Sequence, residues 1–191
     1  MHCWPGPGDR INSFALVSYI PDPLGTYLDQ LRQELVPSCV AQSHVSILPP
    51  RVLASEHAAQ SQLEIALREL PPFQLELSEV QVFRDTSVIY LSIGAGRNHL
   101  LRLHDSLNEK SLGFDEPFEY HPHITLAQNF PVTELDALEE TARQGWAKFG
   151  GCREFTIDVL TFVQNTARNQ WVDLRPFALG AAPVAALIQT S

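Results

Sequence analysis

The sequence predicts an α+β fold made of two similar units, each with the order β-α-β-α-β. Segments with alternating apolar residues, typical of strands, are separated by segments whose apolar residues recur every three or four positions, typical of helices. The order of these segments in the first half of the chain recurs in the second half. At 191 residues and 45% hydrophobic content, the chain is long and apolar enough to bury one core.

The first half is expected to hold three strands and two helices. The strands are predicted over 11–20, 39–48 and 73–83, and the helices over 24–35 and 55–70. The apolar positions of the first helix are three or four residues apart: Leu24, Leu28, Leu31 and Leu35. Prolines close the second strand after residue 48, and Pro71 and Pro72 end the second helix.

The second half repeats this order and adds a hairpin. Strands are predicted over 87–94, 120–128, 153–164 and 170–179, and helices over 97–109 and 132–147. The last two strands turn around the sequence NTARN. When the halves are aligned, the pairs of matched residues are Ser18 with Ser92, His44 with His123, and Leu75 with Ile157. This alignment indicates a diverged internal duplication.

We therefore expect a single domain over 1–191 with four parts. These are an N-terminal arm (1–11), a first repeat (12–84), a second repeat (85–178) and a C-terminal tail (179–191). The repeats should form two antiparallel or mixed sheets with helices outside. The sheets need not coincide with the repeats, because a strand of one unit can pair into the sheet of the other.

Composition excludes several classes of protein. The net charge of −9 argues against a long nucleic-acid track, since phosphate binding depends on clustered Lys and Arg. Cys3, Cys39 and Cys152 are odd in number and widely spaced, which indicates a reducing compartment and neither disulfides nor a zinc site. Neither end of the chain carries an apolar run typical of a signal peptide or a membrane span. We expect a cytoplasmic protein with no membrane partner.

The pattern His-x-Ser/Thr occurs three times, at 44–46, 104–106 and 123–125. The middle copy lies in a predicted helix, where residues two apart do not share a face. The first and third copies lie on predicted strands and at equivalent places in the two repeats. Chance explains that equivalence poorly, so these two copies are the candidate functional motifs.

Each motif should present an imidazole and a hydroxyl on one face of its strand, because alternate strand residues share a face. If a pseudo-two-fold axis relates the repeats, the motifs converge on one groove that holds His44, Ser46, His123 and Thr125. Two imidazoles, one neutral and one protonated, suit general base and general acid catalysis. The two hydroxyls can donate hydrogen bonds to oxygens on which negative charge builds. Such a set can carry out phosphoryl transfer without a metal.

The paired motifs, and the phrase HPHITLA at 121–127 in particular, resemble the two-histidine (2H) phosphoesterase superfamily. This superfamily includes the 2′-5′ RNA ligase-like proteins and cyclic nucleotide phosphodiesterases, and the resemblance covers about residues 12–178. It implies a bilobal α+β fold with a central cleft and catalysis by His44 and His123 without metal or cofactor. The implied partner is a 2′,3′-cyclic or 2′-5′ phosphodiester of an RNA end or a small nucleotide. Ser46 stands where threonine is commoner and keeps the hydroxyl.

Two alternatives remain open at this point. His44, His121 and His123 could ligate zinc or iron in a three-histidine site. The fold could also be a non-catalytic module that only binds a nucleotide. For the neighbouring residues we expect His121 at the rim of the site, Tyr120 in a packing role and Arg51 in a solvated loop. The sequence does not indicate which phosphodiester is cleaved, which histidine is the acid, or an oligomeric state.

Overall fold

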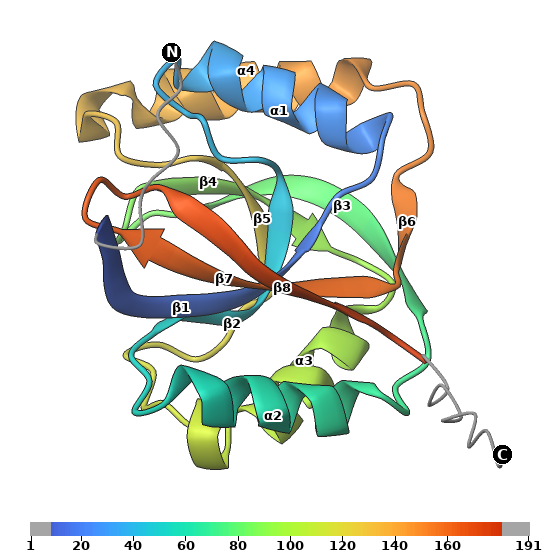
Figure 1. The fold of residues 1–191 in the computed structure, drawn as a ribbon. Coiled ribbons are helices and arrows are strands. Elements are labelled where there is room, and N and C mark those ends of the chain that lie inside the picture. Colours follow the sequence, from blue (N-terminus) through green and yellow to red (C-terminus); the bar gives the residue numbers. More distant parts are fainter. Residues whose placement is uncertain (1–8, 181–191) are drawn as a thin grey trace, which may run out of the picture.

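The computed structural model describes residues 9–180, and the predicted ends of the arm (1–8) and tail (181–191) lie outside the described residues. The strands form two sheets, with helices above and below them (Figure 1). In chain order the elements are β1 (Arg10–Tyr19), α1 (Leu24–Leu35), β2 (His44–Arg51), α2 (Glu56–Leu67), β3 (Phe73–Phe83), β4 (Val88–Ile93), α3 (Arg97–Leu107), β5 (His123–Ala127), α4 (Leu135–Lys148), β6 (Glu154–Ile157), β7 (Val159–Thr166) and β8 (Trp171–Ala178).

Both sheets are four-stranded and antiparallel, with the orders β2-β1-β7-β8 and β5-β4-β3-β6. The predicted fold class, α+β with two sheets and helices outside, is therefore confirmed. Each sheet takes strands from both halves of the chain, since β7 joins β1 and β3 joins β4. The two motif strands, β2 and β5, are edge strands of different sheets and contact each other.

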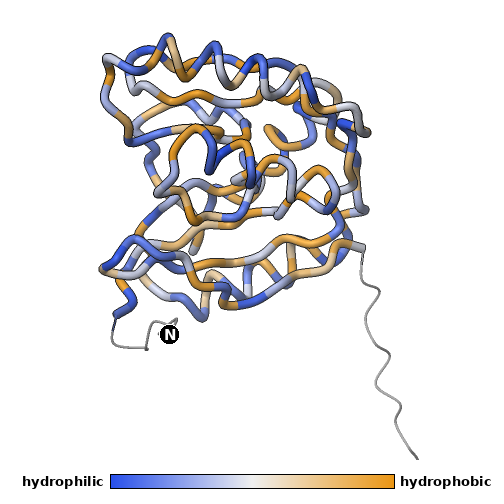
Figure 2. The backbone as a smooth tube through the Cα atoms, turned by 90° about the horizontal axis from the view of Figure 1, so that it is seen from above, coloured by the Kyte–Doolittle hydropathy of each residue, from blue (hydrophilic) through white to orange (hydrophobic). Residues whose placement is uncertain are grey.

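The core lies between the sheets and the helices that cover them. The four leucines that defined the first predicted helix are all buried in α1: Leu24, Leu28, Leu31 and Leu35. Figure 2 shows long hydrophobic stretches along the strands and mixed hydropathy along the helices, the pattern expected when each helix buries only one face. Ser55 caps α2, because its hydroxyl accepts a hydrogen bond from the N–H of Ala58.

β2 differs from its predicted bounds at both ends. It begins at His44, later than expected, and continues through Pro49 and Pro50 to Arg51. Prolines are tolerated there because β2 is an edge strand, where a missing N–H need not break a ladder hydrogen bond. The expectation that the two prolines close the strand was therefore wrong.

The predicted strand over 153–164 is two strands. β6 pairs with β3 in one sheet, and β7 pairs with β1 in the other. The chain changes sheet at Asp158, between the two strands. A sequence pattern of continuous β-propensity cannot reveal such a change of partner, because both strands have the same period.

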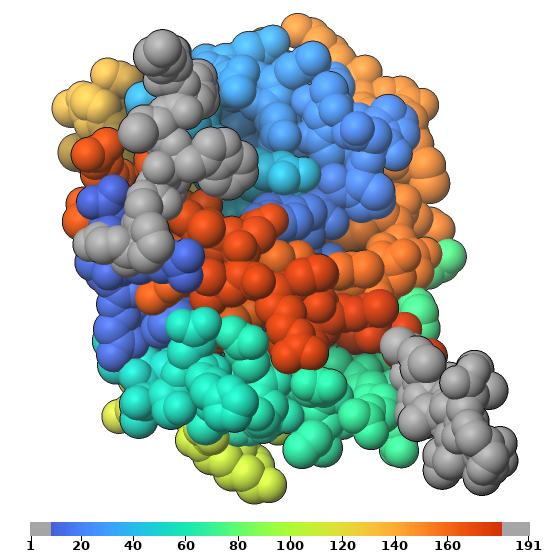
Figure 3. Space-filling view, in the orientation of Figure 1, coloured from blue at the N-terminus to red at the C-terminus, as the bar shows by residue number. Residues whose placement is uncertain are grey.

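β8 closes one face of the molecule. In the space-filling view it lies across the centre, between α1 above and α2 below (Figure 3). An ion pair of 3.0 Å between Arg175 and Glu64 joins β8 to α2. None of the helices found between residues 9 and 180 has both the length and the apolar character needed to cross a bilayer.

Candidate functional site

The two motif strands show the alternation that the sequence predicts. Val45 on β2 and Ile124 on β5 are each fully buried. The residues that flank them point to the other face of each strand and are half-buried: His44, Ser46, His123 and Thr125. The structure thus gives the two motifs the same arrangement, on the edge strands of the two sheets.

Matching hydrogen bonds orient the two imidazoles. Nδ1 of His44 lies 2.7 Å from the carbonyl oxygen of Gln42, and Nδ1 of His123 lies 2.7 Å from that of His121. A carbonyl oxygen can only accept, so Nδ1 carries the hydrogen in both rings. Nε2 then holds the lone pair of each neutral ring, and neither Nε2 has a hydrogen-bond partner within residues 9–180. Each ring can therefore take or give a proton at Nε2.

The hydroxyls of the two motifs also have no hydrogen-bond partner among the described residues. Neither Ser46 nor Thr125 uses its side-chain oxygen in a hydrogen bond to another described residue, and neither oxygen is a fully buried unpartnered atom. Neighbouring hydroxyls serve the fold instead. Ser18 donates to the carbonyl of Val159 at 3.1 Å, and Ser92 donates to that of Glu79 at 3.2 Å. The hydroxyls of Ser46 and Thr125 remain available to a ligand.

Burial lowers the pKa of both His44 and His123 below the usual value for imidazole, because a ring away from water disfavours its charged form. The positive charges of Arg32 and of protonated His123 lower the pKa of His44 further. His123 is therefore close enough to influence the protonation of His44. In the free protein, the neutral form of each ring is favoured near pH 7.

An aromatic pair beside His123 was not anticipated from the sequence. Phe83 and Tyr90 stack with ring centroids 4.1 Å apart, and each meets the ring of His123 edge-on at 5.2 Å. Phe83 also meets the edge of His121. The alternation of apolar residues along β3 and β4 could have predicted that these two rings lie on the same face. It could not have predicted that β3 and β5 belong to the same sheet.

His121 is half-buried, and its ring belongs to this aromatic group, while its carbonyl orients His123. Burial lowers its pKa, and the charge of Arg97 lowers it further. The role of its carbonyl had no signal in the sequence.

Arg51 corrects a prediction. We expected a solvated loop arginine, but it ends β2 and is 3% exposed. Its guanidinium forms an ion pair with Glu116 and donates to Asn108 and to the carbonyl of Leu112, each at 2.8 Å. The packing role expected for Tyr120 is confirmed, because its ring stacks on His104.

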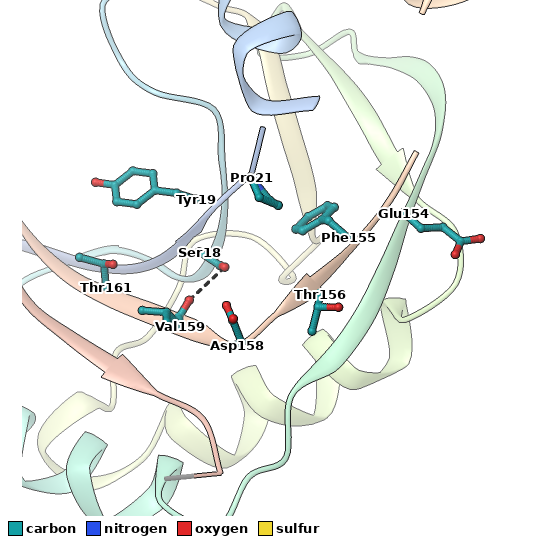
Figure 4. A pocket seen from close by; sticks show the side chains of 9 residues that line it. All are labelled: Ser18, Tyr19, Pro21, Glu154, Phe155, Thr156, Asp158, Val159 and Thr161. Atoms are coloured by element: carbon teal, nitrogen blue, oxygen red, sulfur yellow. Dashed lines mark hydrogen bonds between the residues drawn. The ribbon is translucent and has the colours of Figure 1, made fainter. Parts of the chain in front are cut away.

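A cavity of about 400 Å³ lies beside the motifs, not between them. Figure 4 shows its lining side chains, from β1, β6, β7 and their connections: Ser18, Tyr19, Pro21, Glu154, Phe155, Thr156, Asp158, Val159 and Thr161. Tyr19 connects the cavity to the motifs, because its ring meets the edge of the His44 ring at 6.4 Å. The cavity contains none of the motif residues.

The three-histidine metal site finds no support in the described part of the chain. Among residues 9–180, no three side chains of His, Cys, Asp or Glu gather in a way that could hold a metal ion. His121 and His123 are neighbours, with ring centroids 6.4 Å apart, but His44 does not complete a ligand set with them.

Comparison with solved structures finds proteins of the same fold. E. coli LigT complexed with NADP+ superposes with a TM-score of 0.63 at 19% identity, over 88% of this chain and 98% of LigT. TT0787 of Thermus thermophilus gives a TM-score of 0.61 at 18% identity, over 88% and 98% of the two chains. Usb1 of Kluyveromyces marxianus with uridine monophosphate gives 0.53 at 14% identity, over 88% and 99%. These likenesses show a shared fold.

No curated protein sequence matches the chain significantly. The family model of the 2′-5′ RNA ligase superfamily matches residues 20–169, which is most of the chain and includes both motifs. The protein belongs to the 2′-5′ RNA ligase superfamily of two-histidine phosphoesterases.

Proposed function

We propose that the protein is a metal-independent phosphodiesterase that cleaves 2′,3′-cyclic or 2′-5′ phosphodiesters of RNA ends or small nucleotides. The observation that carries this proposal is the matched setting of His44 and His123, each oriented through Nδ1 and free at Nε2. Membership of the superfamily supports it. Nucleotides in structural neighbours, NADP+ and 3′-AMP in LigT and uridine monophosphate in Usb1, support this class of ligand.

In the proposed reaction one imidazole is neutral and the other is protonated. The neutral Nε2 removes a proton from water as the water oxygen attacks phosphorus. The bond between phosphorus and the leaving ribose oxygen breaks, and the protonated Nε2 of the other ring gives its proton to that oxygen. Ser46 and Thr125 donate hydrogen bonds to the non-bridging oxygens as their negative charge increases. After one turnover both rings return to their starting states by proton exchange with water.

The half-buried ring of Phe83, which stacks on the buried ring of Tyr90, offers a place for a nucleobase. Bases stack on aromatic side chains with little dependence on sequence, so such a surface suits several nucleotides. The pair lies against His123, which would bring a stacked base close to the phosphate-handling groups. This arrangement fits a small nucleotide or an RNA end and needs no extended basic surface.

The direct test is a panel of phosphodiesters assayed with the purified protein in EDTA. The panel contains 2′,3′-cyclic nucleotides, a 2′-5′ dinucleotide, ADP-ribose cyclic phosphate and a 3′-5′ dinucleotide as control. Because the residues supply both proton-transfer groups and oxyanion donors, we expect turnover of at least one of the first three to survive chelation. Loss of all activity in EDTA, with recovery on adding zinc or iron, would contradict the proposal and favour the three-histidine site.

The dependence of rate on pH should be bell-shaped and lie on the acid side of neutrality. Only the form with one neutral and one protonated ring is active, and it is most abundant between the two pKa values of the coupled pair. Burial lowers both pKa values from the usual imidazole value of about 6.5, so the maximum of kcat/KM should fall below about pH 6.5. Activity then decreases as pH rises, because the general acid loses its proton.

Measuring kcat/KM and kcat separately between pH 4 and 9 tests this. The phosphodiester anion stabilises imidazolium, so the alkaline limb of kcat should lie at higher pH than that of kcat/KM. A profile with one limb, or a maximum of kcat/KM above about pH 8, contradicts catalysis by an imidazole pair.

A further inference from the structure

One hydrogen bond joins β2 to the segment that leads into β5. Tyr120 lies three residues before His123, in the irregular segment 113–122, here called the approach segment. Its hydroxyl donates to the carbonyl oxygen of Ser46 at 2.7 Å. β2 and β5 belong to different sheets, so no ladder of backbone hydrogen bonds sets their separation. As an edge strand, β2 presents carbonyls without ladder partners, and Tyr120 satisfies one of them.

Buried polar side chains hold Tyr120 in place. Its ring stacks on His104, with centroids 4.0 Å apart and an interplanar angle of 7°. Nε2 of His104 lies 3.0 Å from a carboxylate oxygen of Glu116, and the same oxygen pairs with Arg51 at the end of β2. The approach segment is thus fixed to β2 at two points, through Tyr120 at Ser46 and through Glu116 at Arg51.

This arrangement exists in one half of the protein only. The residue three positions before His44 is Ala41, which has neither a ring nor a hydroxyl. Ala41 cannot form such a link, so the link is not common to the two repeats. A buried ion pair is also weak evidence for stability, since apolar replacements often serve as well. What the link specifically fixes is the position of one motif strand relative to the other.

We propose that Tyr120 is a positioning residue, which together with His104, Glu116 and Arg51 sets the separation between the His44–Ser46 strand and the His123–Thr125 strand. The inference rests on the proposed function, because the separation matters for a phosphate held between the motifs. Small misplacements of catalytic groups are costly, and about 1 Å can reduce a rate on the order of 10²-fold.

Tyr120→Phe tests the proposal, because it keeps the ring on His104 and removes only the hydroxyl. We expect kcat to fall by about tenfold while KM changes by less than about threefold, since the reacting groups are misplaced and ground-state binding is kept. In NMR titrations the pKa values of His44 and His123 should rise toward about 6.5, because a loosened site admits water. The NMR titration does not depend on enzymatic turnover. It therefore tests the positioning role of Tyr120 independently of the proposed function.

Tyr27→Phe is the matched control. The Tyr27 hydroxyl also donates to a backbone carbonyl, that of Gly145, but this bond joins α1 to α4 and not β2 to the segment that leads into β5. It should leave kcat and both histidine pKa values unchanged. If Tyr120→Phe unfolds under the conditions of the titration, Glu116→Gln is compared with the wild type instead. It should raise the pKa values of both His44 and His123. Unchanged pKa values and kcat in the folded Tyr120→Phe protein, or equal changes in Tyr27→Phe, overturn the proposal. If the pKa values shift in Tyr120→Phe but the wild-type protein turns over no phosphodiester, the proposed function is wrong and the positioning role of Tyr120 stands.

Discussion

Replacing either His44 or His123 by alanine is expected to lower kcat by about 10²- to 10⁴-fold on the phosphodiester that the protein turns over best. Each replacement removes one of the two proton-transfer groups, and general acid or base catalysis contributes this much. The double replacement should cost less than the product of the single losses, because the two rings act as one unit. Steady-state kinetics of the three variants at the pH optimum measures these effects, and circular dichroism verifies that they fold.

His121→Ala is the control for this experiment. It removes an imidazole two residues from His123 but keeps the carbonyl that accepts from Nδ1 of His123. We expect its kcat to stay within about fivefold of the wild type, since it removes no proton-transfer group. If His121→Ala lost as much activity as His123→Ala on every substrate, the site would be misassigned.

Removing a motif hydroxyl should have the next largest effect. Ser46→Ala and Thr125→Ala are each expected to reduce kcat by about 10- to 10³-fold, as found when a single oxyanion donor is lost. KM should change less, because the hydrogen bonds strengthen as charge builds on the phosphate in the transition state. Both hydroxyls lack partners among the described residues, so their loss should hardly change the free energy of unfolding.

Exchanging the two hydroxyl residues separates hydrogen bonding from packing. Ser46→Thr and Thr125→Ser keep an O–H at each position and should retain kcat within about fivefold, because the donor remains. Thr125→Val keeps the shape of threonine without the donor and should behave like Thr125→Ala. Equal kcat for Thr125→Val and the wild type would remove Thr125 from the proposed mechanism.

Much of the fold followed from local patterns. The spacing of the leucines from Leu24 to Leu35 predicted α1 to the residue, and the alternation from Phe73 to Phe83 did the same for β3. Both patterns arise from the periods of the helix and the strand, which every chain obeys locally. The same alternation predicted that His44 and Ser46 share a face, and the equivalence of the two motifs predicted the same for His123 and Thr125.

The sequence by itself therefore determined the fold class, the motif residues and the face of the strand that each occupies. Only the tertiary structure decided which strands are neighbours, as with β3 and β7, each of which pairs into the sheet of the other half. It also decided the burial of Arg51, the carbonyls that orient both imidazoles, and the hydrogen bond from Tyr120 to Ser46. Local periodicity depends on residues a few positions apart, whereas these contacts depend on the path of the chain and on partners such as Tyr120 and Ser46 that are far apart in sequence.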